Sequence, residues 1–364
     1  MAYDIAAYIW PSYHFEPRAQ RFWPENDGEW YTVRRMTPRF PGHYMPRVPL
    51  LGYQDEADPG VAKQHVELAS RYGVNTFIMD WYWFDNAPCF ERQLNEGLIP
   101  ALAGTDSKFY LMWANHEATT LWDMHTDALD PVWTSRVNRE QFEFIMRRII
   151  RKYFSCPNYY KIDGCPVLNL YLTSNFVLGI GSPEEAKKAI EWLREEVKRS
   201  GYPGLHLQVT TYNRPIEPVY RAATGKFADY PSLARYLGAD SATTYNFVSN
   251  GIRCGDYSVV AAKTVEMWSK FEQDYGTYYA HVSAGWDNTP RYPSRGAEHV
   301  VTGATPEKFE ALLREAKGYA DARRGKQPPL ITINSWNEWT EGSYLLPDQK
   351  YGYAFLEAVA KVFL

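Results

Sequence analysis

The sequence predicts an α/β protein, a single (β/α)8 TIM barrel over residues 1–364 with long, aromatic-rich loops. Eight short apolar runs alternate with helical segments, and this alternation indicates parallel strands joined by right-handed crossovers. The length also allows two or three domains, but no linker divides the chain. A doubly wound open sheet is the alternative. It is disfavoured because Trp10-Pro11-Ser12, after the first run, is not a glycine-rich phosphate loop.

Short apolar runs define the predicted strands, since buried parallel strands are nearly continuous in apolar residues. They cover residues 4–9, 74–79, 108–113, 166–171, 205–211, 240–245, 278–283 and 330–333. Several helices begin at a capping residue followed by proline, as at Asp58-Pro59. The predicted helices cover residues 58–73, 88–102, 139–153, 182–200, 259–275, 305–323 and 351–363, with short helices inside 214–238.

Aromatic residues are unusually frequent, at 16% with 13 Trp and 28 Tyr. Many lie in residues 10–58, a segment without periodicity that we interpret as a long loop, and loops of this length are usually functional. Two explanations have about equal weight. The rings fill a generously packed core, or they line a cleft in which flat apolar faces stack.

Charge and cysteine usage exclude several classes of partner. The chain has 39 basic and 43 acidic residues, so we expect no nucleic acid and no anionic membrane as partner. No apolar run approaches the ~20 residues that span a bilayer. No signal peptide is visible, which predicts a cytoplasmic protein if Met1 is the native start. The oligomeric state is left open.

The four cysteines are scattered, without the paired spacing of a zinc site. A disulfide between Cys156 and Cys165 would close a short loop. Free thiols are favoured, because the expected compartment is reducing.

In a barrel of this kind the active site is built from the residues that follow each strand. Carboxylates, amides and rings dominate these positions, which also include Tyr82, Tyr212 and Asn246. Together with two residues of the first loop, the candidate substrate-binding residues are His14, Tyr53, Asp80, Trp81, Trp83, Asn115, His116, Glu117, Tyr245, Trp286, Asp287, Trp336, Asn337 and Trp339.

This mixture is typical of sugar-binding sites, and cleavage of a glycosidic bond needs two carboxyl groups. Glu338 and Glu341 lie three residues apart after the last strand, and neighbouring carboxylates raise one pKa so that an acid stays protonated. We therefore predict that they are catalytic. The alternatives are a solvated pair for the glutamates, an ion pair with an arginine at the barrel mouth for Asp80, and ordinary hydrogen-bonded histidines for His14 and His116.

A metal site from Asp80, His116 and Glu117 resembles no known ligand spacing. No metal and no cofactor are expected.

Four stretches resemble one family. Residues 334–348, Asn-Ser-Trp-Asn-Glu-Trp-Thr-Glu-Gly-Ser-Tyr-Leu-Leu-Pro-Asp, are similar to the segment W-N-E-W-x-E-G of WbsX-like proteins, the group related to glycoside hydrolase family 99. Residues 24–27, 49–55 and 77–84 resemble the same group, so the resemblance runs over nearly the whole chain. It implies a (β/α)8 barrel.

Family 99 proper contains retaining endo-acting α-mannosidases and mannanases that use no metal. The resemblance implies that Glu338 is the base that deprotonates a sugar 2-hydroxyl, giving a 1,2-anhydro intermediate, and that Glu341 is the general acid. This sequence has Thr340 where family 99 proper usually has His, so the resemblance does not predict α-mannan as the substrate.

We expect a glycoside hydrolase acting on an oligosaccharide or polysaccharide. WbsX-like proteins also carry a glycosyltransferase label, so sugar transfer is an alternative, although the sequence has neither a D-x-D motif nor a basic diphosphate cradle. The third candidate is a non-catalytic sugar-binding barrel.

Overall fold

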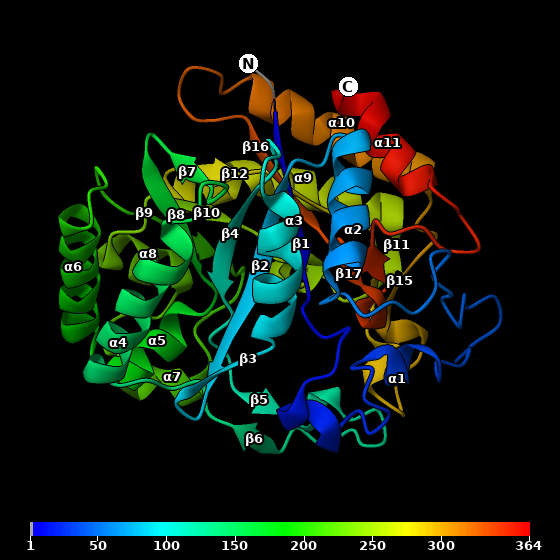
Figure 1. The fold of residues 1–364 in the computed structure, drawn as a ribbon, viewed down its shortest axis with the longest axis horizontal. Helices are drawn as coiled ribbons and strands as arrows, with labels where there is room; N and C mark the ends of the chain where they lie inside the picture. The colour runs from blue at the N-terminus through cyan, green and yellow to red at the C-terminus, as the bar shows by residue number, and fades with distance from the viewer. Residues whose placement is uncertain (1–2) are drawn as a thin grey trace.

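The computed structural model describes residues 3–364, and its centre is a parallel sheet curled into a barrel (Figure 1). Neighbouring strands follow the order β12-β10-β9-β8-β4-β2-β1-β16-β13, and every pairing along this path is parallel. The strands are β1 (Asp4–Ile9), β2 (Thr76–Phe84), β4 (Lys108–Trp113), β8 (Cys165–Leu170), β9 (His206–Thr210), β10 (Ser241–Thr243), β12 (Tyr278–Tyr279), β13 (His281–Ser283) and β16 (Leu330–Asn334).

The predicted barrel is confirmed, with one change in the seventh strand. The segment 278–283 is divided at Ala280 into β12 and β13. β12 pairs with β10 on one side, whereas β13 pairs with β16 on the other. One predicted strand therefore supplies both edges at which the sheet meets itself.

Helices cover the outside of the barrel, largely where the sequence predicts them (Figure 1). The capping side chains of Asp58, Ser182 and Thr305 accept hydrogen bonds from the first turns of their helices. The helices are α2 (Pro59–Arg71), α3 (Ile99–Leu102), α4 (Arg139–Ile149), α5 (Thr173–Ile180), α6 (Pro183–Arg199), α7 (Pro218–Thr224), α8 (Tyr230–Leu237), α9 (Tyr257–Tyr275), α10 (Pro306–Asp321) and α11 (Ala354–Phe363). Two π-helical turns, η2 (Gln93–Leu98) and η4 (Ile150–Phe154), precede α3 and follow α4.

Two local predictions are wrong. The helix predicted from residue 88 begins later, because β3 (Ala87–Cys89) folds back on β2 as an antiparallel hairpin. The helix α5 was not predicted. Its start is fixed by tertiary contacts, since the Asn115 side chain donates to the Leu172 carbonyl and accepts from the Leu172 amide.

Most of the short elements gather at the carboxyl ends of the strands, opposite the two chain termini in Figure 1, whereas β7 (Lys161–Ile162) pairs with the beginning of β8. The long loop 10–58 contains only the turn η1 (Pro17–Arg21) and the helix α1 (Trp30–Val33). The other strands are β5 (Ala118–Thr119), β6 (Pro131–Trp133), β7 (Lys161–Ile162), β11 (Gly255–Asp256), β14 (Trp286–Asp287), β15 (Val300–Thr302), β17 (Asn337–Glu338) and β18 (Ser343–Tyr344). The remaining 3₁₀ turns are η3 (Thr120–Trp122), η5 (Phe247–Asn250), η6 (Thr289–Arg291), η7 (Ala297–His299) and η8 (Trp339–Glu341).

The inside of the barrel is polar and hydrogen-bonded rather than purely aliphatic. The Tyr110 hydroxyl donates to Gln208 Oε1 at 3.1 Å, and Thr243 and Thr332 hydroxyls bond at 2.7 Å. These pairs join strands that are not neighbours in the sheet, so the bonds cross the interior. A buried tyrosine can serve there when its hydroxyl finds a partner, as that of Tyr110 does. Much of the high tyrosine content is therefore core, as one of the two explanations expects.

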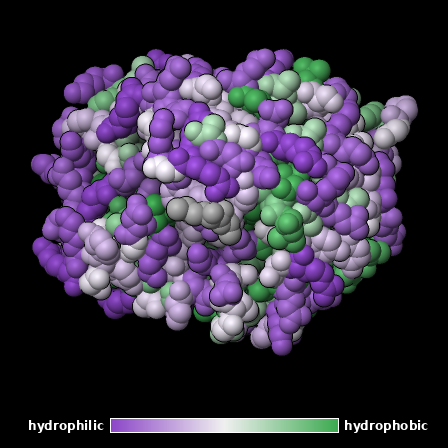
Figure 2. Space-filling model, turned by 90° about the horizontal axis from the view of Figure 1, so that it is seen from above, coloured by the Kyte–Doolittle hydropathy of each residue, from purple (hydrophilic) through white to green (hydrophobic). Residues whose placement is uncertain are grey.

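Figure 2 shows the face at the amino ends of the strands, where hydrophilic residues predominate and hydrophobic ones are scattered. Within residues 3–364, no helix is long and apolar enough to cross a membrane. All four cysteines are free thiols, including the pair for which a disulfide was considered.

Candidate active site

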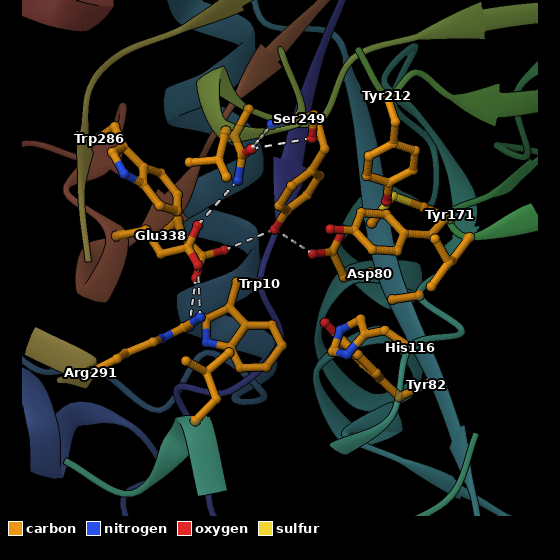
Figure 3. Close-up of a pocket in the computed structure, with 18 of the residues that line it drawn as sticks. Trp10, Asp80, Tyr82, His116, Tyr171, Tyr212, Ser249, Trp286, Arg291 and Glu338 are labelled. Atoms are coloured by element: carbon orange, nitrogen blue, oxygen red, sulfur yellow. Dashed lines mark hydrogen bonds and ion pairs between the residues drawn. The ribbon is translucent and has the colours of Figure 1, made fainter. Parts of the chain in front are cut away.

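A cavity of about 350 Å³ opens at the carboxyl ends of the strands (Figure 3). Its wall combines rings, carboxyl groups and arginines contributed by the residues that follow most of the barrel strands. Six of the predicted site residues line it, namely Asp80, His116, Tyr245, Trp286, Glu338 and Glu341.

The other predicted site residues lie outside the cavity lining. They are His14, Tyr53, Trp81, Trp83, Asn115, Glu117, Asp287, Trp336, Asn337 and Trp339. Two of them, Trp81 and Trp83, face away because side chains alternate along a strand. Trp81 and Trp83 stack on each other on the outer face of β2, and Trp81 Nε1 donates to Glu91 at 2.8 Å.

Two charged residues outside the cavity lining, Glu117 and Asp287, form ion pairs. Glu117 pairs with Arg136 at 3.1 Å. Buried Asp287 accepts from Arg47 Nη2 at 2.6 Å and from His43 Nε2 at 2.7 Å. Although burial opposes ionisation, these partners hold the pKa of Asp287 well below its usual range.

Tyr53 is 38% exposed and packs edge-on against Trp30. His14 is buried, and its Nδ1 lies 2.9 Å from the Phe15 carbonyl oxygen. His116 Nδ1 lies 3.0 Å from the Glu117 carbonyl oxygen in the same way, but this ring faces the cavity. Burial lowers the pKa of both histidines, so both imidazoles are neutral hydrogen-bonding groups near pH 7.

Several lining residues were missed as site residues. Trp10 and Tyr171 directly follow β1 and β8, so their positions at strand ends would have identified them. Tyr82 and Tyr212 were recognised at strand ends but were not chosen as candidate site residues. Arg291 could not be found in this way. It lies in η6, beyond the short strand β14, and no local pattern marks it.

Arg291 organises the carboxyl groups of the cavity. Its Nη2 donates to Glu338 Oε1 and its Nη1 to Glu341 Oε1, both at 2.8 Å (Figure 3). Its Nε lies 3.4 Å from Glu29 Oε1, and the guanidinium is 5.3 Å from the centre of the Trp10 ring. Although burial disfavours its charge, the three glutamates raise the pKa of Arg291, so it stays a cation.

The two candidate catalytic glutamates share this one guanidinium, and both are largely buried. Glu338 is 1% exposed and Glu341 is 9% exposed. Burial raises the pKa of Glu338 well above its usual range, with a further rise from Glu341 and an opposing effect of Arg291. Burial also raises the pKa of Glu341, again opposed by Arg291. The direction of both shifts therefore favours a proton shared by the pair.

The hydrogen bonds distinguish the two glutamates. Glu338 has donors on both oxygens, because Tyr245 Oη lies 3.1 Å from Oε2 while Arg291 binds Oε1. The second oxygen of Glu341 has only a long contact of 3.5 Å from Asn246 Nδ2. Asp80, for which a pairing arginine was considered, instead has Tyr245 Oη 2.9 Å from its Oδ2.

Asn337 fastens the first loop to the strand that carries the glutamates. Its Oδ1 accepts from the Trp10 amide at 2.8 Å, and its Nδ2 donates to the Trp10 carbonyl at 2.9 Å and to Glu56 Oε2 at 2.6 Å. Trp10 Nε1 in turn donates to Glu29. Buried Trp339 packs against Trp30 of the same loop, with ring centroids 5.9 Å apart, whereas buried Trp336 packs against Phe77 of β2 and His65 of α2.

A close backbone approach explains the glycine that follows Glu341. Gly342 has a φ of 62°, and a Cβ there would lie 2.8 Å from Arg47 Nη2. A Cβ on Gly285, which precedes Trp286, would lie 2.3 Å from the Gly342 carbonyl oxygen. Neither position tolerates a side chain without moving the segments that hold Trp286 and Glu341.

We expect Glu56→Gln to stabilise the fold at neutral and alkaline pH. Burial raises the pKa of Glu56 to about 8, although Asn337 and Gln93 donate hydrogen bonds to it. The folded state therefore keeps a proton that the unfolded state loses above its pKa of ~4.3, so stability falls as pH rises towards 8. This loss reaches roughly 4 kcal/mol, and Gln, which mimics the protonated acid, removes it.

Chemical denaturation between pH 5 and pH 8 measures this effect. Glu91→Gln is the matched control with the opposite sign. Although burial opposes its ionisation, hydrogen bonds from Arg148, at 2.6 Å, and Tyr153 lower the pKa of Glu91, so this variant should lose stability at neutral pH. A pH slope that is unchanged in Glu56→Gln would contradict the buried, protonated acid.

The described part of the chain, residues 3–364, contains no group of three or more His, Cys, Asp or Glu that could hold a metal ion. The chemistry available from the side chains at the cavity is proton transfer by paired carboxyl groups, beside rings and neutral hydrogen-bonding groups. Such a set can bind a polyhydroxylated ring and exchange protons with its oxygens.

Comparison with solved structures defines the class, a parallel α/β barrel of a fold found in glycoside hydrolases. The GH99 endo-alpha-mannosidase from Bacteroides thetaiotaomicron superposes with a TM-score of 0.61 at 14% identity, over 98% of this chain and 95% of that one. A structure described as a glycoside hydrolase-like protein gives 0.62 at 15% identity, over 100% and 94%. GH5_18 from Streptomyces cattleya gives 0.52 at 11% identity, over 99% and 80%.

The chain belongs to the WbsX family. The family model described as glycosyltransferase WbsX matches residues 5–359, which confirms the resemblance seen in the sequence. Two strains of Xanthomonas campestris pv. campestris have a relative described as uncharacterized protein WxcX, 28% identical over 358 residues. The match covers 97% of this chain but 48% of that protein, so the chain spans about half the length of these curated relatives.

Proposed function

We propose that residues 1–364 act as one catalytic barrel domain that hydrolyses a glycosidic bond of an oligosaccharide or polysaccharide without a metal. The observation that carries this proposal is the pair Glu338 and Glu341, bound to the two terminal nitrogens of one guanidinium in a ring-lined cavity. Two carboxyl groups of unequal protonation are what glycoside cleavage requires.

Glu338 is assigned the base and Glu341 the acid, in agreement with what the family resemblance implies. Although burial raises the pKa of Glu338, the donors on both of its oxygens favour its ionised form, which can take a proton from the substrate. Glu341 has one oxygen with only a long contact, so it can present a proton to the departing glycosidic oxygen. We propose overall retention of configuration, with Glu341 returning as the base for water in the second step.

The family description favours a second candidate, transfer of a sugar from a nucleoside diphosphate donor. A diphosphate needs free cations, and both arginines of the cavity lining are already paired, Arg214 with Glu217 at 2.6 Å and Arg291 with the glutamates. The charge of the lining therefore favours hydrolysis. A non-catalytic sugar-binding role would not explain why the pKa values of both glutamates are raised.

An activity screen tests the proposal. The protein would be incubated separately with a panel of purified polysaccharides and with nucleoside diphosphate sugars plus glycan acceptors. We expect new reducing ends from at least one polysaccharide, with the first product formed in the retained anomeric configuration by NMR. Elongation of an acceptor by a nucleoside diphosphate sugar, without any new reducing ends, would establish the transferase instead.

A further inference from the structure

We propose that Asp80 is a protonated carboxylic acid in the resting protein and positions Glu338 through the Tyr245 hydroxyl. In this arrangement Asp80 donates to Tyr245 Oη, and Tyr245 donates to Glu338 Oε2. The proton on Asp80 follows from the geometry alone. The consequence for Glu338 as a base rests on the proposed function.

One hydroxyl stands between two carboxyl groups. Tyr245 Oη lies 2.9 Å from Asp80 Oδ2 and 3.1 Å from Glu338 Oε2 (Figure 3). A phenol carries a single proton, so it donates fully to only one of them. With both carboxyls ionised, the other contact would bring two sets of lone pairs together in a buried place. A proton on one carboxyl turns both contacts into good hydrogen bonds.

The partners of the remaining oxygens decide which carboxyl carries the proton. Glu338 Oε1 accepts a charge-assisted hydrogen bond from Arg291 at 2.8 Å. Asp80 Oδ1 is buried and has no hydrogen-bond partner among residues 3–364. An ionised Asp80 would leave that charge unsolvated, which costs far more than an unsatisfied neutral oxygen. The proton therefore resides on Asp80.

The wider surroundings agree with this assignment. Asp80 is 1% exposed, and burial raises its pKa well above the usual range, opposed by the hydrogen bond with Tyr245. The cation among its neighbours, Arg291, is already bound to three glutamates. The titratable and charged groups that face Asp80 are Tyr8, Tyr82, His116, Tyr171, Tyr245, Arg291, Glu338 and Glu341.

Infrared difference spectroscopy of the protein without substrate tests the protonation directly. We expect the spectrum of the wild type minus Asp80→Asn at pH 7 to show the carbonyl stretch of a protonated carboxylic acid. Loss of a carboxylate band instead would overturn the proposal. Asp256→Asn is the matched control, because the hydrogen bond from Lys308 Nζ at 3.0 Å lowers the pKa of Asp256, and this variant should lose carboxylate absorption.

The positioning role is tested with the polysaccharide that the screen identifies. Asn can donate to Tyr245 as the protonated acid does, so Asp80→Asn should retain about tenfold more of kcat than Asp80→Ala, which removes this donor. Tyr245→Phe removes a donor from Glu338, so the acidic limb of the pH profile of kcat/KM should move to higher pH. A kcat of Asp80→Asn no higher than that of Asp80→Ala, in variants that melt like the wild type, would contradict this positioning role. If no polysaccharide is hydrolysed, the proposed function fails, and the infrared result still decides the protonation.

Discussion

Glu341→Gln should lower the hydrolysis of an unactivated glycosidic bond by ~10²–10⁴-fold, the usual contribution of a general acid. Gln keeps the shape of the side chain and its hydrogen bond with Arg291, but it has no proton to give. Binding of the substrate should survive, because the rings of the cavity and Asp80 are unchanged. The measurement is kcat on the identified polysaccharide, together with calorimetric binding of the same glycan.

The leaving group separates the roles of the two glutamates. An aryl glycoside whose phenol is acidic needs no protonation to depart, so Glu341→Gln should release the phenol in a rapid first burst, followed by slow turnover because the second step still lacks its base. Glu338→Gln should stay inactive on both substrates, because the base is required whatever group departs. A burst in Glu338→Gln and none in Glu341→Gln would reverse the assignment. Glu140→Gln, on the exposed side of α4, serves as the control and should behave as the wild type.

Arg291→Met should destabilise the fold by roughly 3–5 kcal/mol at pH 8, which is the usual cost of leaving a buried charge unpaired. The reason is that Glu29, Glu338 and Glu341 would lose the one cation that they share. The folded-state pKa values of Glu338 and Glu341 would rise further, so the folded state would hold protons that the unfolded state releases above pH ~4.3. The destabilisation should therefore grow as pH rises, and be smallest near pH 5.

Urea denaturation at pH 5 and pH 8 measures this effect, and Arg314→Met is the matched control. Arg314 pairs with Glu310 at 2.7 Å on the surface, where its side chain is 53% exposed, so its loss should cost less than about 1 kcal/mol at either pH. Equal stability of Arg291→Met and the wild type at pH 8 would mean that the carboxyl cluster does not depend on the guanidinium. Activity should also be lost, since both glutamates would be displaced and protonated.

The sequence predicted the barrel because its signals are local. An apolar run or a helix cap such as Asp58-Pro59 is recognised from the residues of one strand or one helical turn. The alternation of strands and helices along the chain then predicts that the strands pair in parallel. Division of the seventh strand at Ala280 was not visible, because it depends on which neighbours close the sheet. The start of α5 likewise depends on Asn115, which is distant in the sequence.

The sequence by itself determined that Glu338 and Glu341 follow the last barrel strand, and that the residues following the other strands meet them at one mouth. Only the tertiary structure decided which neighbours reach the cavity. Side chains alternate along β2, so Asp80 and Tyr82 face the cavity while Trp81 and Trp83 pack outside. The cation that binds both glutamates, Arg291, comes from an irregular turn whose position no local pattern encodes. Protonation of the carboxyl groups is set by burial and by the donors around them, which exist only once the chain has folded.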